Sequence, residues 1–260
     1  MEPAVFAGSQ LQAAFAAGFW TFVRIGAALM VAPPFGSRAL STRIRLVLAL
    51  ALTAVIAPML PAPPAPDAFS AAWFATLATQ LAIGLLIGFV LQMVFEAIVM
   101  AGELISLGMG LSFATLADPL RGVSTGVLGQ YFLVLATLLF LSMDGHLALI
   151  GALVESFIRL PVGVGLPGDG LLPVAAFAGR MFLFGVQIAL PAMISLLLVN
   201  LAFGVISRAA PTLNPIAVGF PITLTLGFLI LQFSMSPLLA GLRGLLDGAW
   251  TLLAGVLQAG

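Results

Sequence analysis

Three polar side chains that could do chemistry lie in an otherwise apolar stretch, QMVFEAIVMAGELISLG (92–108). Gln92, Glu96 and Glu103 are separated by four and seven residues, so they share one face of a helix. Carboxylates on an apolar helix are costly in lipid and usually face a partner or water. Three interpretations stay open: acids solvated beyond the membrane edge, a buried polar contact with another subunit, or a proton relay. A relay lacks a basic or histidine partner nearby in the sequence.

Enzymatic chemistry has few candidate residues in this chain. The sequence has no cysteine, which excludes disulfides, thiol nucleophiles and thiolate metal sites. His146 is the single histidine and follows Asp144 and Gly145 where an apolar span ends, which indicates an interfacial histidine at a helix start. An intramembrane hydrolase needs an activated nucleophile beside a base, and no GxSxG-like serine is present. We therefore expect no enzymatic activity, no cofactor and no metal.

Arg24 lies within the first apolar segment of the chain. An unpaired arginine at the centre of a membrane helix costs about 2.5–3.5 kcal/mol on insertion scales. The sequence therefore predicts a protein partner for the Arg24 guanidinium, such as a carboxylate or the carbonyl groups of a helix end.

The segment after Glu103 combines glycines with large apolar side chains. Its candidate gating residues are Ser106, Gly108, Met109, Gly110, Leu111, Phe113 and Leu116. Glycine gives the backbone freedom and methionine is an adaptable side chain, so we expect the helix to break at Gly102, Gly108 and Gly110. A flexible apolar loop can close a pore by excluding water from a hydrophobic constriction. Ordinary packing is the competing explanation.

The composition and the charge-free runs indicate the type of fold that positions these residues. The chain has 260 residues, of which 62% are hydrophobic and 7% are charged, with a net charge of zero. A soluble domain carries about 25% charged residues, so a free soluble protein is excluded, as is intrinsic disorder. The balanced charge excludes a nucleic-acid partner. Six runs without charge are each long enough to cross a membrane as a helix: 3–23, 46–66, 68–95, 122–143, 181–207 and 209–242.

We expect an all-α, multi-helix integral membrane protein with about six long, hydrophobic, kinked helices in a single domain, 1–260. The predicted helices lie near 10–32, 44–60, 70–97, 126–143, 174–206 and 216–243, with a short amphipathic helix near 147–160. The last apolar region contains Pro211, Pro215, Pro221 and Pro237, which can kink a helix. They fit either a loop with ordinary kinks or a kinked hairpin packed against other subunits.

The arginines predict an orientation. Arg38, Arg43 and Arg45 follow the first span, and the N-terminal tail holds no arginine. Cytoplasmic loops of membrane proteins are enriched in basic residues, so the N-terminus is predicted outside. Inner segments then carry five arginines and outer segments three.

Three blocks of the sequence resemble one protein family. AGELISLGMGLSFATLADP (101–119) closely resembles the signature of the FliR family, the flagellar branch of the FliR/SctT export-gate subunits of type III secretion. The block 24–58 resembles the family's first two helices and their loop. The block 207–228 resembles its C-terminal region, where the AVGFP form favours the flagellar branch. The resemblance covers essentially the whole chain. The first loop departs from the family, which often has a proline where residues 39–42 read ALST.

The resemblance implies a non-enzymatic subunit of the flagellar basal body in the bacterial inner (cytoplasmic) membrane. It implies assembly with several copies of FliP and with FliQ into a closed, hetero-oligomeric helical gate that passes unfolded export substrates beside FlhA and FlhB. Part of the assembly would be raised toward the periplasm, so that Arg24, Glu96 and Glu103 face protein. The loop Ser106–Leu116 would plug the closed channel. The alternative is a secondary transporter with broken helices, although no repeated halves with matching breaks are visible.

Overall fold

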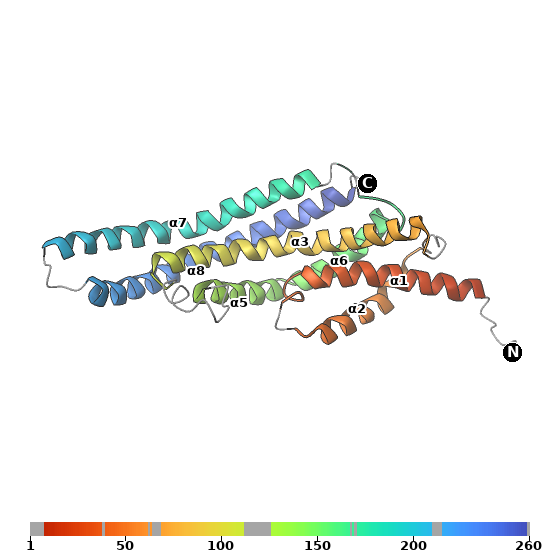
Figure 1. The fold of residues 1–260 in the computed structure, drawn as a ribbon, viewed down its shortest axis with the longest axis horizontal. Coiled ribbons are helices and arrows are strands. Elements are labelled where there is room, and N and C mark those ends of the chain that lie inside the picture. Colours follow the sequence, from red (N-terminus) through yellow and green to blue (C-terminus); the bar gives the residue numbers. More distant parts are fainter. Residues whose placement is uncertain are drawn as a thin grey trace. The chain divides into compact units, whose positions relative to one another are not determined.

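The fold consists of helices. The computed structural model describes residues 8–37, 40–61, 63, 69–111, 126–166, 168, 171–209 and 215–258, and every regular element in these ranges is helical. The sequence prediction of an all-α, multi-helix protein is confirmed. The elements are α1 (Gly8–Val31), α2 (Thr42–Ile56), the short 3-10 helix η1 (Ala57–Met59), α3 (Ala71–Gly108), α5 (Val127–Ser142), α6 (Gly145–Arg159), α7 (Leu171–Ala209) and α8 (Pro215–Gln258) (Figure 1).

Several helices have the length and composition of membrane spans. Among the described residues, three qualify outright: Thr42–Met59, Ala71–Gly108 and Leu172–Ala209. The number rises to five if α5 with α6, and the two bent halves of α8, each form one span. Helix α1 has 24 residues, a length that also suffices to cross the hydrocarbon core. The six long apolar helices predicted from sequence correspond to α1, α2, α3, α5, α7 and α8.

Two helices are longer than the sequence indicated. The prediction placed the end of the third helix near residue 97 and a break at Gly102, and this is wrong because α3 continues to Gly108. A Cβ at Gly102 would lie 2.8 Å from the carbonyl oxygen of Leu128 on α5. Gly102 is therefore a point of close helix packing. The last helix was predicted to end near residue 243, yet α8 continues to Gln258.

The prolines are accommodated within the helices. Pro215 is the first residue of α8, a position where the missing N–H has no helical partner to lose. Pro221 and Pro237 lie inside the same helix, and Pro191 lies inside α7. Pro211 lies outside the described residues.

The chain forms two compact units by its contacts. The first comprises Met1–Gln92, Asp144–Phe177 and Gly248–Gly260, and the second comprises Met93–Met143 and Ala178–Asp247. Helices α3, α7 and α8 contribute to both units. The single domain predicted from sequence stays a prediction.

In the first unit, α1 packs against α2 and against the beginning of α3. Two glycines allow α3 to approach α1 closely. A Cβ at Gly88 would lie 2.7 Å from the carbonyl oxygen of Ala28, and one at Gly84 would overlap the carbonyl oxygen of Arg24. The core of this unit consists of fully buried apolar side chains that include Trp20, Ile25, Leu29, Ile83, Ile87, Leu91, Leu149 and Leu153.

In the second unit, the end of α3 packs against α5, α7 and α8. The rings of Phe95 and Phe140 meet edge to face, with 5.5 Å between their centres. Gly185 on α7 faces the carbonyl oxygen of Ala97, which a Cβ would approach to 2.8 Å. The buried apolar side chains of this unit include Phe95, Ile98, Ile105, Phe132, Phe140, Leu196, Leu238 and Leu242.

Candidate functional site

The Arg24 guanidinium is the most deeply buried charged group that the structure describes, with no exposed surface. Its Nε donates to Oε1 of Gln80 (2.8 Å). Its Nη1 donates to the carbonyl oxygen of Ser156 (2.7 Å) and to the Ser156 hydroxyl (3.2 Å), and its Nη2 donates to the carbonyl oxygen of Leu160 (2.8 Å). The guanidinium carbon also lies 4.0 Å from the centre of the Phe157 ring. We call these five residues the Arg24 cluster.

The C-terminus of α6 provides the main electrostatic partner of Arg24. Ser156 lies in the last turn of α6 and Leu160 is its C-cap residue. The Ser156 carbonyl accepts the last helical hydrogen bond, from the N–H of Leu160 (3.0 Å), and both carbonyls lie at the negative end of the helix dipole. All four acceptors of the guanidinium are neutral, so dipoles stabilise its charge. Arg24 thereby connects α1, α3 and α6. The sequence predicted a carboxylate or helix-end carbonyls as the partner of Arg24, and the structure provides the carbonyls.

Gln80 reaches the guanidinium because α3 lies close to α1. Gly84 lies one turn after Gln80, and a Cβ there would overlap the carbonyl oxygen of Arg24 and lie 2.8 Å from the Cβ of Ala27. Neither Gln80 nor Ser156 was predicted from the sequence as a partner of Arg24. A glutamine in a charge-free run is the one signal that could have indicated Gln80.

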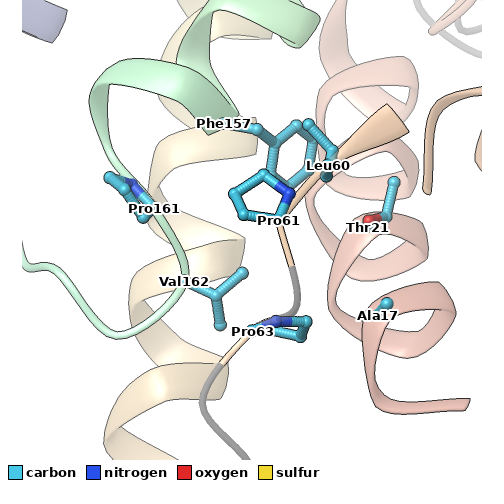
Figure 2. Close-up of a pocket in the computed structure, with 8 residues that line it drawn as sticks. All are labelled: Ala17, Thr21, Leu60, Pro61, Pro63, Phe157, Pro161 and Val162. Carbon is cyan, nitrogen blue, oxygen red and sulfur yellow. The ribbon is translucent and has the colours of Figure 1, made fainter. Parts of the chain in front are cut away.

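A cavity of about 50 Å³ lies beside the Phe157 ring in the first unit. Its walls are apolar apart from one hydroxyl, that of Thr21, and three of its residues are prolines (Figure 2). The lining residues are Ala17, Thr21, Leu60, Pro61, Pro63, Phe157, Pro161 and Val162. The space is sufficient for a few water molecules or one small apolar group. Because no lining residue titrates, the cavity offers no acid–base chemistry.

The end of α3 holds the described part of the predicted gating loop. The N–H of Leu111 donates to the carbonyl oxygen of Ser106 (3.1 Å), and the N–H of Gly110 donates to that of Leu107 (3.1 Å). Gly110 has a φ of 78°. These bonds form a Schellman motif, in which a residue with positive φ ends the helix. The sequence prediction of a break near Gly108 and Gly110 is therefore correct.

The gating residues before this break are packed within the second unit. Met109 is buried, and a Cβ at Gly227 on α8 would lie 2.6 Å from its sulfur. A Cβ at Gly108 would lie 3.1 Å from Leu196 Cδ1 on α7. The side chain of Ser106 is buried, and its hydroxyl has no hydrogen-bond partner among the described residues. The predicted gating residues Phe113 and Leu116 lie outside the described residues.

The two acids on α3 lie in different surroundings. Glu96 is exposed on this chain, whereas Glu103 is half-buried against the start of α5. The Glu103 carboxylate accepts a hydrogen bond from the N–H of Gly126, the N-cap residue of α5. Within the described ranges, no group of three or more histidine, aspartate or glutamate side chains is arranged to hold a metal ion.

Several known proteins are similar in sequence to this chain over most of its length. The profile of one family, bacterial export proteins, family 1, matches residues 15–249. The chain belongs to this family. Flagellar biosynthetic protein FliR of Pectobacterium carotovorum subsp. carotovorum is 40% identical over 240 residues, 92% of each chain. The FliR proteins of Escherichia coli (strain K12) and Bacillus subtilis (strain 168) are 42% identical over 224 residues and 29% identical over 233 residues. These matches cover 85% of each chain for E. coli, and 88% of this chain and 90% of its relative for B. subtilis.

The family 1 export proteins thus include this chain, and the predicted resemblance to FliR is confirmed. The matched residues contain the whole Arg24 cluster, Glu103 and the end of α3. The relatives are named as flagellar biosynthetic proteins rather than as enzymes. The apolar helices that are long enough to span a membrane indicate a membrane location.

Proposed function

We propose that this chain is a subunit of the flagellar type III secretion export gate, in which it forms the channel for unfolded flagellar proteins together with FliP-type and FliQ-type proteins. The observation that carries this proposal is 40% identity to a flagellar biosynthetic protein FliR over 92% of both chains. The resemblance of residues 101–119 to the FliR signature supports it. Proteins of the FlhA and FlhB type would act beside the gate.

Exposed apolar surface supports an assembled state. The window of α2 that qualifies as a span is 17% buried within this chain, and that of α7 is 28% buried, against 72% for α3. Exposed apolar side chains on α7 include Phe182, Leu190, Ile194, Leu197, Leu201 and Val205. Large exposed apolar surfaces mark regions that contact other proteins or lipid. Neighbouring gate subunits would cover part of this surface, and Glu96 would face them.

The segment Ser106–Leu116 is proposed as the plug of the closed channel. Its beginning is anchored by the Schellman motif at Gly110 and by the packing of Met109 on Gly227. The proposal assigns Leu111, Phe113 and Leu116 to the constriction that excludes water.

The proposed location is the bacterial inner membrane within the basal body, with part of the assembly raised toward the periplasm. The arginines after α1 support an N-terminus on the outer side, because cytoplasmic loops are enriched in basic residues. Arg24 is compatible with this location, because the Arg24 cluster provides hydrogen-bond acceptors for the guanidinium inside the protein.

Leakage of cells tests the plug. Phe113→Ser together with Met109→Ser, or a shortened segment 106–116, should increase the leakage of ions or small solutes when the complete gate is expressed. Complex yield is measured in parallel, and Gly179→Ala serves as the control because a Cβ there meets no atom within 4 Å. Wild-type leakage with normal complex yield would show that the segment only packs. In the same cells, deletion of the whole chain should stop secretion of flagellar proteins.

A further inference from the structure

Helix α2 is buried along one narrow stripe only. Its buried residues Ala49, Thr53 and Ile56 are separated by four and three residues, so they share one side of the helix, and α2 packs against α1. The Thr53 hydroxyl donates to the carbonyl oxygen of Ala49 (2.7 Å) and is satisfied within the helix. The opposite side of α2 is exposed and apolar, and we call it the α2 apolar face. Its residues are Ile44, Val47, Leu50, Ala51, Ala54 and Val55.

The charged side chains of α2 lie at its start. Arg43 is exposed on the same side of the helix as Leu50, which follows it by seven residues. No acid that the structure describes forms an ion pair with Arg43. Arg45 instead donates to the carbonyl oxygens of Phe35 (2.9 Å) and Ser37 (3.2 Å). The next charged residue in the sequence is at position 67, so the α2 apolar face has a cation at one end only.

Aromatic rings lie near the other end of α2. Leu60, which follows η1, lines the same cavity as Thr21 of α1. One turn of α1 also carries Phe19 and Trp20, whose ring centres lie 5.7 and 5.6 Å from that of Trp73 at the start of α3. Two of the three tryptophans of the chain are therefore found here. Tryptophan is enriched where membrane proteins meet the headgroup region.

The length of α2 suits a lipid bilayer. The segment Thr42–Met59 has 18 residues, which corresponds to about 27 Å at the rise of an α-helix. The hydrocarbon core of a bilayer is about 30 Å thick. Arginines at one end, tryptophans near the other end and an apolar face between them are the features of a span that contacts both membrane surfaces.

The side chains of the α2 apolar face also fit lipid better than a protein neighbour. Helix α7 is likewise exposed on this chain, but it presents the polar side chains of Gln187 and Asn200. Polar side chains within a span face protein or water and form hydrogen bonds between helices. The α2 apolar face has no side chain that forms hydrogen bonds from Ile44 to Val55. Acyl chains require none.

We propose that the α2 apolar face contacts the acyl chains of the bilayer directly, with Arg43 at the phosphate groups of anionic phospholipids. A guanidinium binds phosphate through both charge and paired hydrogen bonds. This inference goes beyond the proposed export function, because it identifies which surface of the chain borders lipid. A gate subunit covering α2 would overturn it and leave the export function standing.

The first test measures what surrounds α2 in the gate complex with FliP-type and FliQ-type proteins, reconstituted in nanodiscs of phosphatidylethanolamine and phosphatidylglycerol. The chain has no cysteine, so Val47→Cys, Leu50→Cys and Ala49→Cys each introduce one site for a nitroxide spin label. The complex without an introduced cysteine gives the background from the partner subunits. Labels at 47 and 50 should collide often with oxygen, which concentrates in hydrocarbon, and rarely with a water-soluble nickel chelate. The label at the buried position 49 should meet neither probe.

Two results of this measurement would overturn the proposal. Low accessibility to both probes at positions 47 and 50, as at position 49, would show that a protein covers the face. Frequent collisions with the nickel chelate would show that the face borders water.

The second test concerns Arg43 and uses phosphatidylglycerol and phosphatidylcholine that carry a diazirine in the acyl chain near the headgroup. The ratio of their crosslinks to residues 42–50 should fall about fivefold in Arg43→Gln, as expected for the loss of one arginine near an anionic membrane surface. Arg43→Lys should retain most of the ratio. Arg159→Gln is the control, because Arg159 pairs with Glu155 on α6 and should not affect α2.

An unchanged ratio in assembled Arg43→Gln would refute the contact with the headgroup. If that variant does not assemble, the wild-type complex decides. Phosphatidylglycerol should then be enriched over phosphatidylcholine at residues 42–50 relative to residues 51–59, and equal ratios for the two segments would refute the proposal.

Discussion

Removing the Arg24 guanidinium is expected to destabilise the first unit strongly. Arg24→Leu deletes four hydrogen bonds that join α1 to Gln80, Ser156 and Leu160, and it removes the contact with the Phe157 ring. It also leaves the Gln80 amide and the Leu160 carbonyl inside protein without their donor. A buried acceptor left without its donor costs about 1–3 kcal/mol, so the two acceptors together give a loss of about 2–6 kcal/mol.

A positive charge at position 24 should not be sufficient to restore the hydrogen bonds of the Arg24 cluster. Arg24→Lys keeps a positive charge, but its single ammonium group cannot reach acceptors on α3 and α6 in the fork geometry of a guanidinium. We expect an intermediate loss for this variant. The matched control is Arg159→Leu, because Arg159 pairs with Glu155 at 2.6 Å on the surface, with both side chains largely exposed. Exposed pairs of this type contribute at most about 1 kcal/mol.

Thermal unfolding of the detergent-solubilised gate complex provides the assay. At about 2–4 °C per kcal/mol for a chain of this size, Arg24→Leu should lower the midpoint by about 4–24 °C or reduce complex yield correspondingly. Arg159→Leu should stay within about 4 °C of the wild type. Equal midpoints and yields for Arg24→Leu and the wild type would refute the role assigned to the cluster.

Three further predictions concern glycines and assembly. Gly84→Ala should cost about 1–3 kcal/mol in unfolding free energy, because its Cβ would overlap the Arg24 carbonyl. Gly26→Ala has open space around the new Cβ and should be neutral or stabilising. Equal unfolding midpoints for the two variants would contradict the close packing of α3 on α1. Gly110→Ala should cost about 1–2 kcal/mol because its φ is 78°, and Gly110→Asn should cost less; a neutral Gly110→Ala would argue against the Schellman motif. The chain expressed without FliP-type and FliQ-type partners should be proteolysed or polydisperse in size-exclusion chromatography; a protease-resistant, monodisperse monomer would count against assembly.

The helices could be located from sequence because membrane helices leave a compositional signal. Charge-free runs alone placed α5 near 126–143, and the helix spans Val127–Ser142. The end of α3 could not be located in this way. Gly102 has the residue type of a helix break, yet its role is to admit the Leu128 backbone. Only the position of α5 in space distinguishes these two uses of glycine.

The candidate sites, like the helices, could be predicted from the sequence only in part. The cost of an isolated charge indicated that Arg24 needs a partner. The identity of the partners was not predictable, because Gln80, Ser156 and Leu160 lie 56, 132 and 136 residues away in sequence. Glu103 was recognised as a polar residue in need of a contact. Its partner is a backbone N–H beside two glycines, and backbone groups leave no residue-specific mark in a sequence.

The composition of the complex purified from native membranes tests whether this chain is a subunit of an export gate. An affinity-tagged chain expressed from its own locus is solubilised in mild detergent, and the purified species is analysed by native mass spectrometry. We predict one detergent-stable complex that contains this chain with FliP-type and FliQ-type proteins. Recovery of this chain as a stable, partner-free monomer, from cells in which those proteins are present, would contradict it.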